Sequence, residues 1–555
     1  MSKSIGLSIS PLLPMSPGER WLLRACVAIP LAALLMFFGV PMLSIAWRSL
    51  MQEGGGIGLA NYFALVDTPG VWRAAGNSMW LGLTTTTITV VLAFIVAYGL
   101  ERTCMYGRRF IAVSMTLPLL APSLVLGLGL IFLLGRNGLV GKLLDLRMDV
   151  YGFSGLLIAD ILYALPQAVL IIRASLRHGD SRQYDAAEVL GATAWRQFID
   201  ITLPGTRYGL LSAAFVVFTI TITDFGNAVV IGGDFPVLAT EIYNQVSGQM
   251  KFGMGAVVGI LLLLPAALSI WIERVATRRQ AHSMGGDAGH TPKAKHHAAR
   301  DIGFTVGCST IAVGIYAVIL TVVLASFVRL WPYKFEFTLK HYDITLSDGY
   351  APLWNSVYLS TIAALFGATM LFLMAFGVRK FPGRIAQLTS LLSALPVGVP
   401  GLVLGLAYVF TFNSATLPWG FLYGSAALLA LCNYYHYHTQ GYVAMMTGVR
   451  NVSSNLEDAV AVLGGGNGRI LKDVYWPAMK ATLWSVMAFL FMRSMVTLSA
   501  VIFLVTPGMS VGAVSVMRLD EAGFTSQAAA FSTCIMVLVG SLALVLHGLT
   551  QRKKP

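Results

Sequence analysis

The segment "DAAEVLGATAWRQFIDITLP", Asp185–Pro204, is a polar stretch between two long apolar runs. A second copy, "DAVAVLGGGNGRILKDVYWP", occupies Asp458–Pro477, 273 positions further along the chain. Eight of the twenty positions are identical in the two copies, and in the first copy they are Asp185, Ala186, Val189, Leu190, Gly191, Arg196, Asp200 and Pro204. A polar segment that returns in register indicates two related halves within one chain.

The composition around these segments is that of a membrane protein. Of 555 residues, 56% are hydrophobic and only 11% are charged, whereas soluble domains carry about 25% charged residues. The apolar residues form runs of about 20 or more, long enough for a helix to cross a bilayer. We therefore predict an all-α polytopic membrane protein with about twelve transmembrane helices, near residues 22–47, 76–99, 110–134, 154–176, 207–232, 256–276, 303–328, 353–378, 387–411, 420–447, 480–505 and 526–548.

Further repeats define the two halves. "NSMWLGL", Asn77–Leu83, returns as "NSVYLST", Asn355–Thr361, and "LPLLAPSLVLGLGL", Leu117–Leu130, returns as "LPVGVPGLVLGLAY", Leu395–Tyr408, both 278 positions later. Each half then holds six spans, and an even number returns the chain to its starting side. The sequence thus predicts two parallel six-helix halves related by a pseudo-two-fold axis. The predicted boundaries are residues 1–276 for the first half, 277–301 for a linker and 302–555 for the second half.

The linker is rich in Gly, His and Lys and has no apolar periodicity, which is typical of a flexible cytoplasmic segment. Its histidines, His290, His296 and His297, are of a metal-ligand type, but a solvated basic linker is the simpler interpretation. The five cysteines are scattered without a CxxC pair, which argues against disulfides and metal clusters. We expect no metal site in this chain.

The net charge of +13 would suggest a nucleic-acid partner in a soluble protein. Here the positive-inside rule explains it, because basic clusters such as Arg102, Arg108 and Arg109 fall on one side of the predicted topology. Both termini are then predicted to lie in the cytoplasm. The first apolar run is too long for a signal peptide, so we expect it to remain as a helix.

Each polar segment falls between the fourth and fifth spans of its half, on the predicted cytoplasmic side. Small and apolar residues follow a helical spacing within it. We expect a short helix with Asp185 near its start, where a carboxylate favours the helix dipole, a turn at Gly191 and an end at Pro204. One such segment would also fit an amphipathic loop on the membrane surface. Two copies in register favour a docking surface.

The spacing of these residues resembles the EAA loop of ABC importer permeases of the binding-protein-dependent type I class. The family pattern is Glu-Ala-Ala, three residues, Gly, nine residues, Ile, one residue, Leu-Pro. The matching positions are Asp185, Ala186, Ala187, Gly191, Ile201, Leu203 and Pro204 in the first half, and Asp458, Ala459, Gly464 and Pro477 in the second. Asp replaces Glu in both copies, Trp476 replaces Leu, and "GGGNG" is looser than "GATAW", so the two sites are expected to be unequal.

The resemblance implies a set of partners. In that family the loop is a coupling helix that fits a groove on a cytoplasmic ATPase. Two loops imply two copies of an ABC ATPase that hold ATP and Mg²⁺, together with a periplasmic solute-binding protein and a multi-pass location in the bacterial inner membrane. The sequence holds no G-x-x-x-x-G-K-[ST] phosphate loop, so we expect a permease subunit with no catalytic residues and no cofactor of its own.

Polar residues inside the spans are candidates for a translocation pathway, because an ionisable group there costs about 2.5–3.5 kcal/mol to insert. We expect the pathway between the halves, lined by spans three to five and nine to eleven. The candidates are Asp160, Asp224, Asn433, His436 and Arg493. The structural alternatives are an ion pair between Arg493 and Asp224, an arginine that reaches an interface, and histidine hydrogen bonds between helices.

The stretch "TDFGNAVVIGGDFPVLATEIYNQV", Thr223–Val246, resembles the large fused permeases of 2-aminoethylphosphonate importers. Fused iron(III) importer permeases are near relatives, and thiamine, putrescine and sulfate permeases belong to the wider group. A zwitterion could use Arg493 for its phosphonate and Asp224 for its amine, so the resemblance predicts a phosphonate, with iron(III) as the alternative.

Two other classes of transport protein fit twelve spans. A secondary transporter of the major facilitator class also has two parallel six-span halves, but its characteristic loop lies between spans two and three, where this chain has only "ERTCMYGRR". A channel or assembly factor without an energy source is the other alternative. Neither explains two matched docking segments.

Overall fold

The computed structural model describes residues 17–52, 55–145, 149–177, 179–283, 296–346, 348–381, 383–413 and 418–551. Over these residues the regular structure is helical except for one antiparallel hairpin, β1 (Val328–Leu330) with β2 (Lys334–Phe337). Nine helices of this described part are long and apolar enough to cross a membrane, and one bent helix pair makes a tenth. The prediction of an all-α polytopic membrane protein is confirmed, with a count close to the twelve predicted spans.

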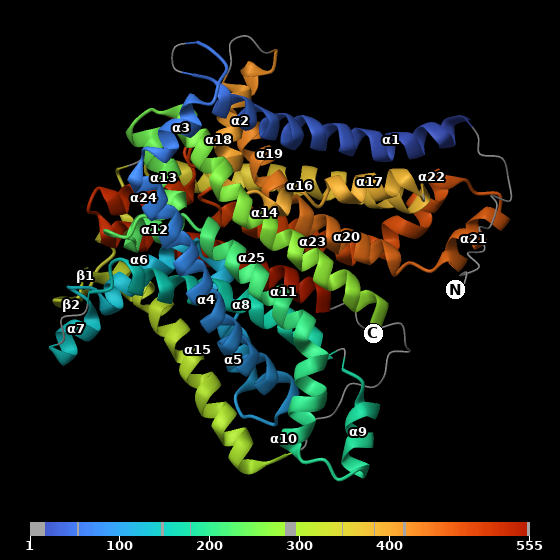
Figure 1. Ribbon diagram of the computed structural model, residues 1–555, viewed down its shortest axis with the longest axis horizontal. Helices are drawn as coiled ribbons and strands as arrows, with labels where there is room; N and C mark the ends of the chain where they lie inside the picture. The colour runs from blue at the N-terminus through green and yellow to red at the C-terminus, as the bar shows by residue number, and fades with distance from the viewer. Residues whose placement is uncertain are drawn as a thin grey trace.

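The helices of the first half follow one another as in the predicted spans, with short helices between them (Figure 1). They are α1 (Pro17–Leu34), α2 (Val40–Leu50), α3 (Ala60–Val66), α4 (Pro69–Arg102), α5 (Arg108–Ser114), α6 (Ser123–Leu134), α7 (Leu139–Leu144), α8 (Phe153–Arg177), α9 (Ser181–Val189), α10 (Ala194–Gln197), α11 (Leu203–Thr223), α12 (Gly226–Ile231), α13 (Leu238–Tyr243) and α14 (Phe252–Ser283).

The second half repeats this order from α15 onward. Its helices are α15 (Ala298–Phe327), α16 (Ala351–Lys380), α17 (Arg384–Leu392), α18 (Gly401–Phe412), α19 (Ala426–His436), α20 (His438–Arg450), α21 (Ser454–Val462), α22 (Asn467–Arg469), α23 (Trp476–Val496), α24 (Gly512–Glu521) and α25 (Thr525–Gln551). Residues 284–295 of the predicted linker, with His290, lie outside the described residues. The boundaries between halves and linker stay a prediction.

Several predicted spans are broken where a continuous helix was expected. The ninth, 387–411, divides into α17 and α18, whose axes differ by 106°. Prolines explain this break and the matching one before α6, since proline lacks the N–H that a helix interior needs. The fifth stops at Thr223, the eleventh stops at Val496, and the tenth is divided at Tyr437.

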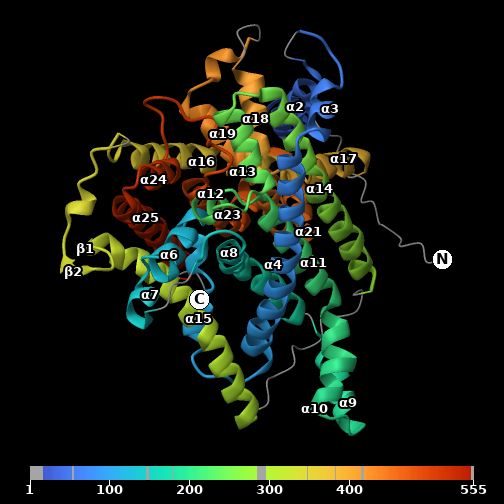
Figure 2. The same cartoon turned by 60° about the vertical axis from the view of Figure 1, so that its left-hand side comes forward.

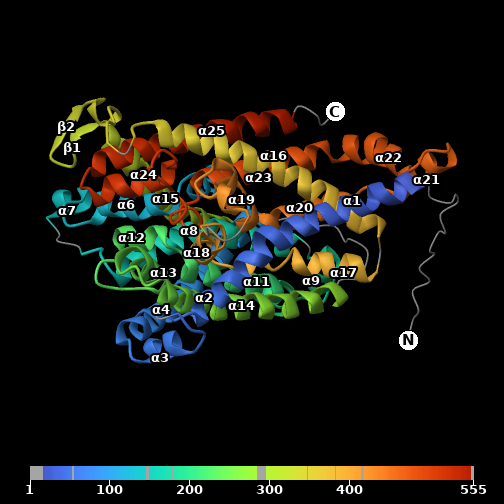
Figure 3. The same ribbon diagram turned by 90° about the horizontal axis from the view of Figure 1, so that it is seen from above.

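The first helix of each half packs against the other half. α1 lies along α16 (Figures 1 and 3), and α15 lies along α6 and α4 (Figure 2). In Figure 1 the helices of the two halves lie close together on the left and diverge to the right, where α9 and α21 stand apart. The two polar segments therefore stand apart from each other, one on each half, on the side where the halves diverge.

In each half, the chain just after the fifth span packs closely against the start of the helix that follows the proline break. A Cβ atom on Gly226 would overlap Ser123 Oγ at the start of α6. In the second half the residue types are exchanged, and a Cβ atom on Gly401 would overlap Ser499 Oγ. Gly401 matches Ser123 and Ser499 matches Gly226 in the repeat. Each of these two helix contacts thus requires one glycine, and the glycine can stand on either of the two helices that meet.

The exchanged pair gives a test of this packing. Gly226→Ser should lower the free energy of unfolding by about 1–3 kcal/mol, as overpacking of a filled site does. The double variant Ser123→Gly with Gly226→Ser copies the second half and should recover most of that loss. Thermal unfolding of the purified protein in detergent measures both. A double variant no more stable than the single one would contradict the argument.

Candidate functional site

The two polar segments begin with the same kind of cap. The side chain of Asp180 accepts a hydrogen bond from the Arg182 N–H at the start of α9. The side chain of Ser453 accepts one from the Asn455 N–H at the start of α21. The prediction that Asp185 stands near the helix start is wrong, because α9 begins one turn earlier, where the carboxylate of Asp180 meets its free N–H groups. Asp185 is exposed in the second turn.

Both first helices end at a left-handed glycine. Gly191 has φ 74° and Gly464 has φ 72°, a conformation that side chains disfavour. In both segments the N–H of the next residue donates to the carbonyl five residues earlier, at 2.9 and 2.8 Å. This is the Schellman arrangement of a helix end. The predicted turns at the two glycines are confirmed.

Beside each glycine lies an uncovered apolar pair. Val189 and Leu190 are 88% and 85% exposed, and their counterparts Val462 and Leu463 are 78% and 81% exposed. A Cβ atom added to either glycine would meet nothing within 4 Å. Contiguous exposed apolar residues rimmed by polar ones mark interaction surfaces. Each segment therefore presents an apolar surface that no described part of this chain covers.

The predicted end of the polar segment at Pro204 coincides with the start of α11, but the proline does not interrupt the helix. The helix runs on from Ala194 to Thr223, so the segment's second helix and α11 are one element. A π-helical turn, Phe198–Thr202, comes just before the proline and accommodates its missing N–H. The second half has the same arrangement, with the π-helical turn Ile470–Tyr475 before Pro477. A force on either segment passes directly into a long helix of the bundle.

The second segment is held to α16 by charge. The Glu457 carboxylate on α21 accepts hydrogen bonds from Arg379, at 2.9 Å, from Lys380 and from the Tyr475 hydroxyl. Burial alone would raise the pKa of Glu457, but the Lys380, Tyr475 and Arg379 contacts outweigh it and hold the pKa below its ordinary value. Glu457 is therefore ionised at neutral pH and serves as an anchor.

The first segment has a tyrosine in place of the carboxylate at the matching position. Tyr184 replaces Glu457 there, and its hydroxyl lies 2.9 Å from Thr202 Oγ1. The Arg102 guanidinium lies over its ring, 5.0 Å from the centroid. The two segments thus share a backbone but differ in what ties them to the bundle.

A cavity of about 390 Å³ lies between the two halves. Its walls come from the predicted spans three to five and nine to eleven, with Ile270 added from the sixth. Of the predicted pathway residues, Asp224, His436 and Arg493 line it. Asp160 and Asn433 do not, and lie buried behind the wall.

Arg493 on α23 contributes a cation to the cavity without a carboxylate beside it. Its guanidinium lies 4.9 Å from the centroid of the Tyr437 ring, and the Tyr163 side chain lines the same cavity. None of the ion pairs among the described residues includes Arg493. The alternative of an ion pair with Asp224 is therefore not the arrangement found.

Asp224 supports the break after α11. Its carboxylate accepts from the Asn227 N–H at 2.8 Å, and the Asn227 side chain donates to Asp160 at 2.9 Å. In the second half Asn433, the counterpart of Asp160, donates to Ser494 at 2.8 Å. These buried amides and acids position the wall of the cavity.

Sequence reasoning missed several polar residues of the wall. Gln167 and Gln440 both line the cavity and occupy matching positions of the repeat. The Tyr163 side chain, at the position that His436 occupies in the second half, also lines it. The sequence does contain a signal for the two glutamines. The same polar residue occurs inside two spans at the repeat offset of 273 positions.

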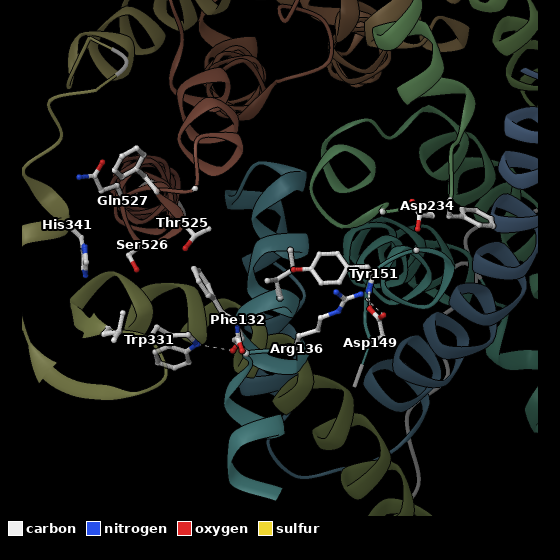
Figure 4. A pocket seen from close by; sticks show the side chains of 18 residues that line it. Phe132, Arg136, Asp149, Tyr151, Asp234, Trp331, His341, Thr525, Ser526 and Gln527 are labelled. Atoms are coloured by element: carbon white, nitrogen blue, oxygen red, sulfur yellow. Dashed lines mark hydrogen bonds and ion pairs between the residues drawn. The ribbon is translucent and has the colours of Figure 1, made fainter. Parts of the chain in front are cut away.

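A second, larger pocket of about 960 Å³ (Figure 4) lies beside α6 and β1, on the left in Figure 1 and away from α9 and α21. Arg136 lies beside Tyr151 and pairs with Asp149 at 3.0 Å. On the other wall the Trp331 indole donates to the Phe132 carbonyl. The pocket is formed by loops of both halves and contains both charged and aromatic groups.

One cluster of metal-ligand types occurs in the described part of the chain, formed by Cys104, His296 and Asp301, whose ligand atoms lie within 4.8 Å of one another. The Asp301 carboxylate already accepts from the Cys104 and His297 N–H groups and pairs with Arg300. Since a guanidinium 3.1 Å away repels a cation, the cluster is a junction between α4 and the start of α15.

Comparison with known proteins gives a consistent set of matches. The family model described as "Binding-protein-dependent transport system inner membrane component" matches residues 89–282. The molybdenum transport system permease protein ModB of Haemophilus influenzae is 30% identical over 201 residues, which cover 35% of this chain and 88% of that protein.

Two longer relatives span both halves. The ferric transport system permease protein FbpB of Actinobacillus pleuropneumoniae is 27% identical over 558 residues, covering 96% of this chain and 79% of that protein. The thiamine transport system permease protein ThiP of Brucella abortus is 26% identical over 417 residues, covering 73% of this chain and 74% of that protein.

The charged anchor of the second segment predicts an effect of pH and of substitution. The depressed pKa of Glu457 means that its contribution is complete above the ordinary glutamate pKa and is lost as the pH falls through the depressed value. Glu457→Gln should mimic that loss at neutral pH and lower the free energy of unfolding by about 1–3 kcal/mol, the cost of unsatisfied charged partners. Thermal unfolding at pH 7 measures it. Asp185→Asn on the first segment is the control, because Asp185 is exposed there, and equal effects of the two variants on the free energy of unfolding would contradict the assignment.

Proposed function

The chain belongs to the family of binding-protein-dependent transport system inner membrane components, as the membrane subunit of a type I ABC importer with two fused permease halves, and we propose that it passes a small charged solute from a periplasmic binding protein to the cytoplasm. A permease of this family is a transport component and not an enzyme. The family description itself names the binding protein on which such transport depends.

The paired apolar surfaces carry the proposal that this chain is driven by two ATPase subunits. Val189 with Leu190, and Val462 with Leu463, are exposed at matching sites, and each leads into a continuous long helix of the bundle. A groove on an ATPase would cover each pair and move the helix behind it. We propose that ATP and Mg²⁺ are held by these two subunits, and that the coupling residues are Asp185, Ala186, Ala187, Gly191, Pro204, Asp458, Ala459, Gly464 and Pro477.

We propose that α9 and α21 lie on the cytoplasmic side of the inner membrane, where a cytoplasmic ATPase can reach them. We propose the same side for both termini. The larger pocket around Arg136 and Trp331 then opens to the periplasm, where the binding protein docks.

The docking role predicts a separation of stability from activity. Leu190→Asp and Leu463→Asp should each change the free energy of unfolding by less than about 0.5 kcal/mol, because the side chains are exposed. Each should weaken ATPase binding by about 30-fold or more, as loss of an interface hot spot of about 2 kcal/mol does. Pull-down titration and stimulated ATP hydrolysis measure this with the cognate ATPase.

Phe421→Asp is the matched control, since Phe421 is 80% exposed at the opposite end of the bundle. It should leave ATPase binding unchanged. The purified chain alone should hydrolyse no ATP. Hydrolysis by the lone chain, or normal binding by both leucine variants, would remove the docking proposal.

For the solute, iron(III) now has better support than a phosphonate. Relatives whose printed names specify ferric transport align with 96% and 90% of this chain. The cavity adds a chemical condition. A bare Fe³⁺ ion would be repelled by the Arg493 guanidinium, so we propose that iron passes as a complex with anionic ligands.

A phosphonate remains the second candidate solute, because the Arg493 guanidinium would also bind it. Arg493 offers donors of the geometry that phosphonate oxygens accept, and Asp224 lines the same cavity. A zwitterionic aminophosphonate would satisfy both side chains. Either solute presents negative charge to Arg493.

The cavity predicts an effect of Arg493 on uptake. Arg493→Gln should reduce solute uptake about tenfold or more, because a charge-assisted hydrogen bond is worth about 1.5–3 kcal/mol, while Arg493→Lys should keep part of it. Uptake is measured in proteoliposomes with the binding protein and ATPase, using labelled iron(III) and labelled 2-aminoethylphosphonate in parallel. Wild-type uptake by both Arg493→Gln and Asp224→Asn would rule out a solute contact in this cavity.

A further inference from the structure

The two polar segments differ in how their second helices are capped. In the first, the Thr193 hydroxyl is the N-cap of α10 and accepts from the Arg196 N–H at 3.3 Å. The matching residue in the second is Gly466, the N-cap of α22, and glycine has no side chain to accept. The free N–H groups at this helix start need another partner.

That partner comes from the other half of the chain. Glu19, in the first turn of α1, places its Oε1 2.7 Å from the Asn467 N–H, which donates to it. A Cβ atom on Gly466 would overlap this same oxygen. Gly466 therefore has no side chain to cap the helix, and the same lack of a side chain leaves room for the Glu19 carboxylate. This explains part of the loose "GGGNG" turn, whose third glycine is required by an incoming carboxylate.

Glu19 does not simply repeat an arrangement of the first segment. α1 belongs to the first half but packs along α16 of the second. At the matching end of α15, the acidic residue Asp301 accepts from the Cys104 N–H in the turn after α4. The first segment takes its cap from its own Thr193. Only the second of these two described segments is capped by a helix of the opposite half.

The second segment is consequently held on both sides of its turn. Glu457 ties α21 to Arg379 and Lys380 at the end of α16. Glu19 ties α22 to α1. The helix that follows continues into α23. A displacement of this segment thus reaches α16, α23 and, through Glu19, a helix of the first half.

We propose that Glu19 is a positioning residue that couples the second docking segment to the first half of the permease, so that the two segments are unequal in how they transmit ATPase movement. The inference rests on the proposed docking function. The second segment drives both halves, while the first drives α11 and the helices packed on it. Solute transport per ATP should then depend on Glu19 even though it contacts neither the cavity nor the exposed apolar pairs.

The test separates a cap from a coupling residue. Glu19→Ala removes both roles. Glu19→Ala with Gly466→Thr restores a cap within the segment, as Thr193 provides in the first half, but leaves α1 unconnected. Glu19→Gln keeps an acceptor oxygen and serves as the conservative variant. Hydrogen exchange over residues 464–470 is measured on the purified chain without ATPase, and solute transported per ATP is measured in proteoliposomes.

Glu19→Ala should speed exchange over residues 464–470 at least fivefold and lower transport per ATP at least threefold. The double variant should restore the slow exchange but not the transport ratio, and Glu19→Gln should keep most of both. Restoration of both by the double variant, or unchanged exchange in Glu19→Ala, would overturn the proposal. Thr193→Gly is the matched control and should speed exchange near residue 193 with a smaller loss of transport per ATP.

The hydrogen-exchange result does not depend on the docking proposal. The exchange measurement needs no ATPase, so the Glu19 contact is tested even where the chain fails to bind the cognate ATPase. Failure of the wild-type chain to stimulate ATP hydrolysis would contradict the proposed function. Slow exchange that depends on Glu19 would still stand.

Discussion

A lipid bilayer offers no hydrogen-bond partner to a peptide group, and the rest of this structure depends on how the chain meets that constraint where two long helices stop inside it. α11 stops before Asp224 and α23 stops before Thr497. At the first break Asp224 accepts from the Asn227 N–H. At the second the Thr497 hydroxyl donates to the Arg493 carbonyl and lies 2.9 Å from the Tyr437 hydroxyl. The polar groups that the breaks require also line the cavity between the halves.

The halves share a backbone plan but differ in charge. Glu101 at the end of α4 pairs with Arg173 and Arg177 on α8. Its counterpart at the end of α16 is Arg379, which pairs with Glu457 on α21. The charge at this position is negative in the first half and positive in the second, and its partner lies on a different element in each half. In the first half the ion pair joins two long helices, and in the second it joins a long helix to a polar segment.

The sequence predicted the repeat, the all-α membrane class, the glycine turns and the three cavity residues Asp224, His436 and Arg493. These follow from periodicity, from register between copies and from the cost of charge in a bilayer. The sequence-based predictions were wrong where residues outside the local pattern determine a helix end or a contact. Pro204 was expected to close the polar segment before the fifth span, but a π-helical turn joins the two in one continuous helix. Asp185 was expected near a helix start that Asp180 occupies. The contact of Glu19 with Asn467 joins residues 448 positions apart, and no local pattern could reveal it.

The cavity contains Arg493 on one side and Ile220 at the matching position on the other. Two identical subunits could not build this wall, because symmetry would place a guanidinium at both positions or at neither. Two such cations across a shared space would repel each other. Fusion of the halves removes that restriction, since each copy is free to diverge alone. A fused chain can therefore present an odd number of charges to the cavity, which two identical subunits could not.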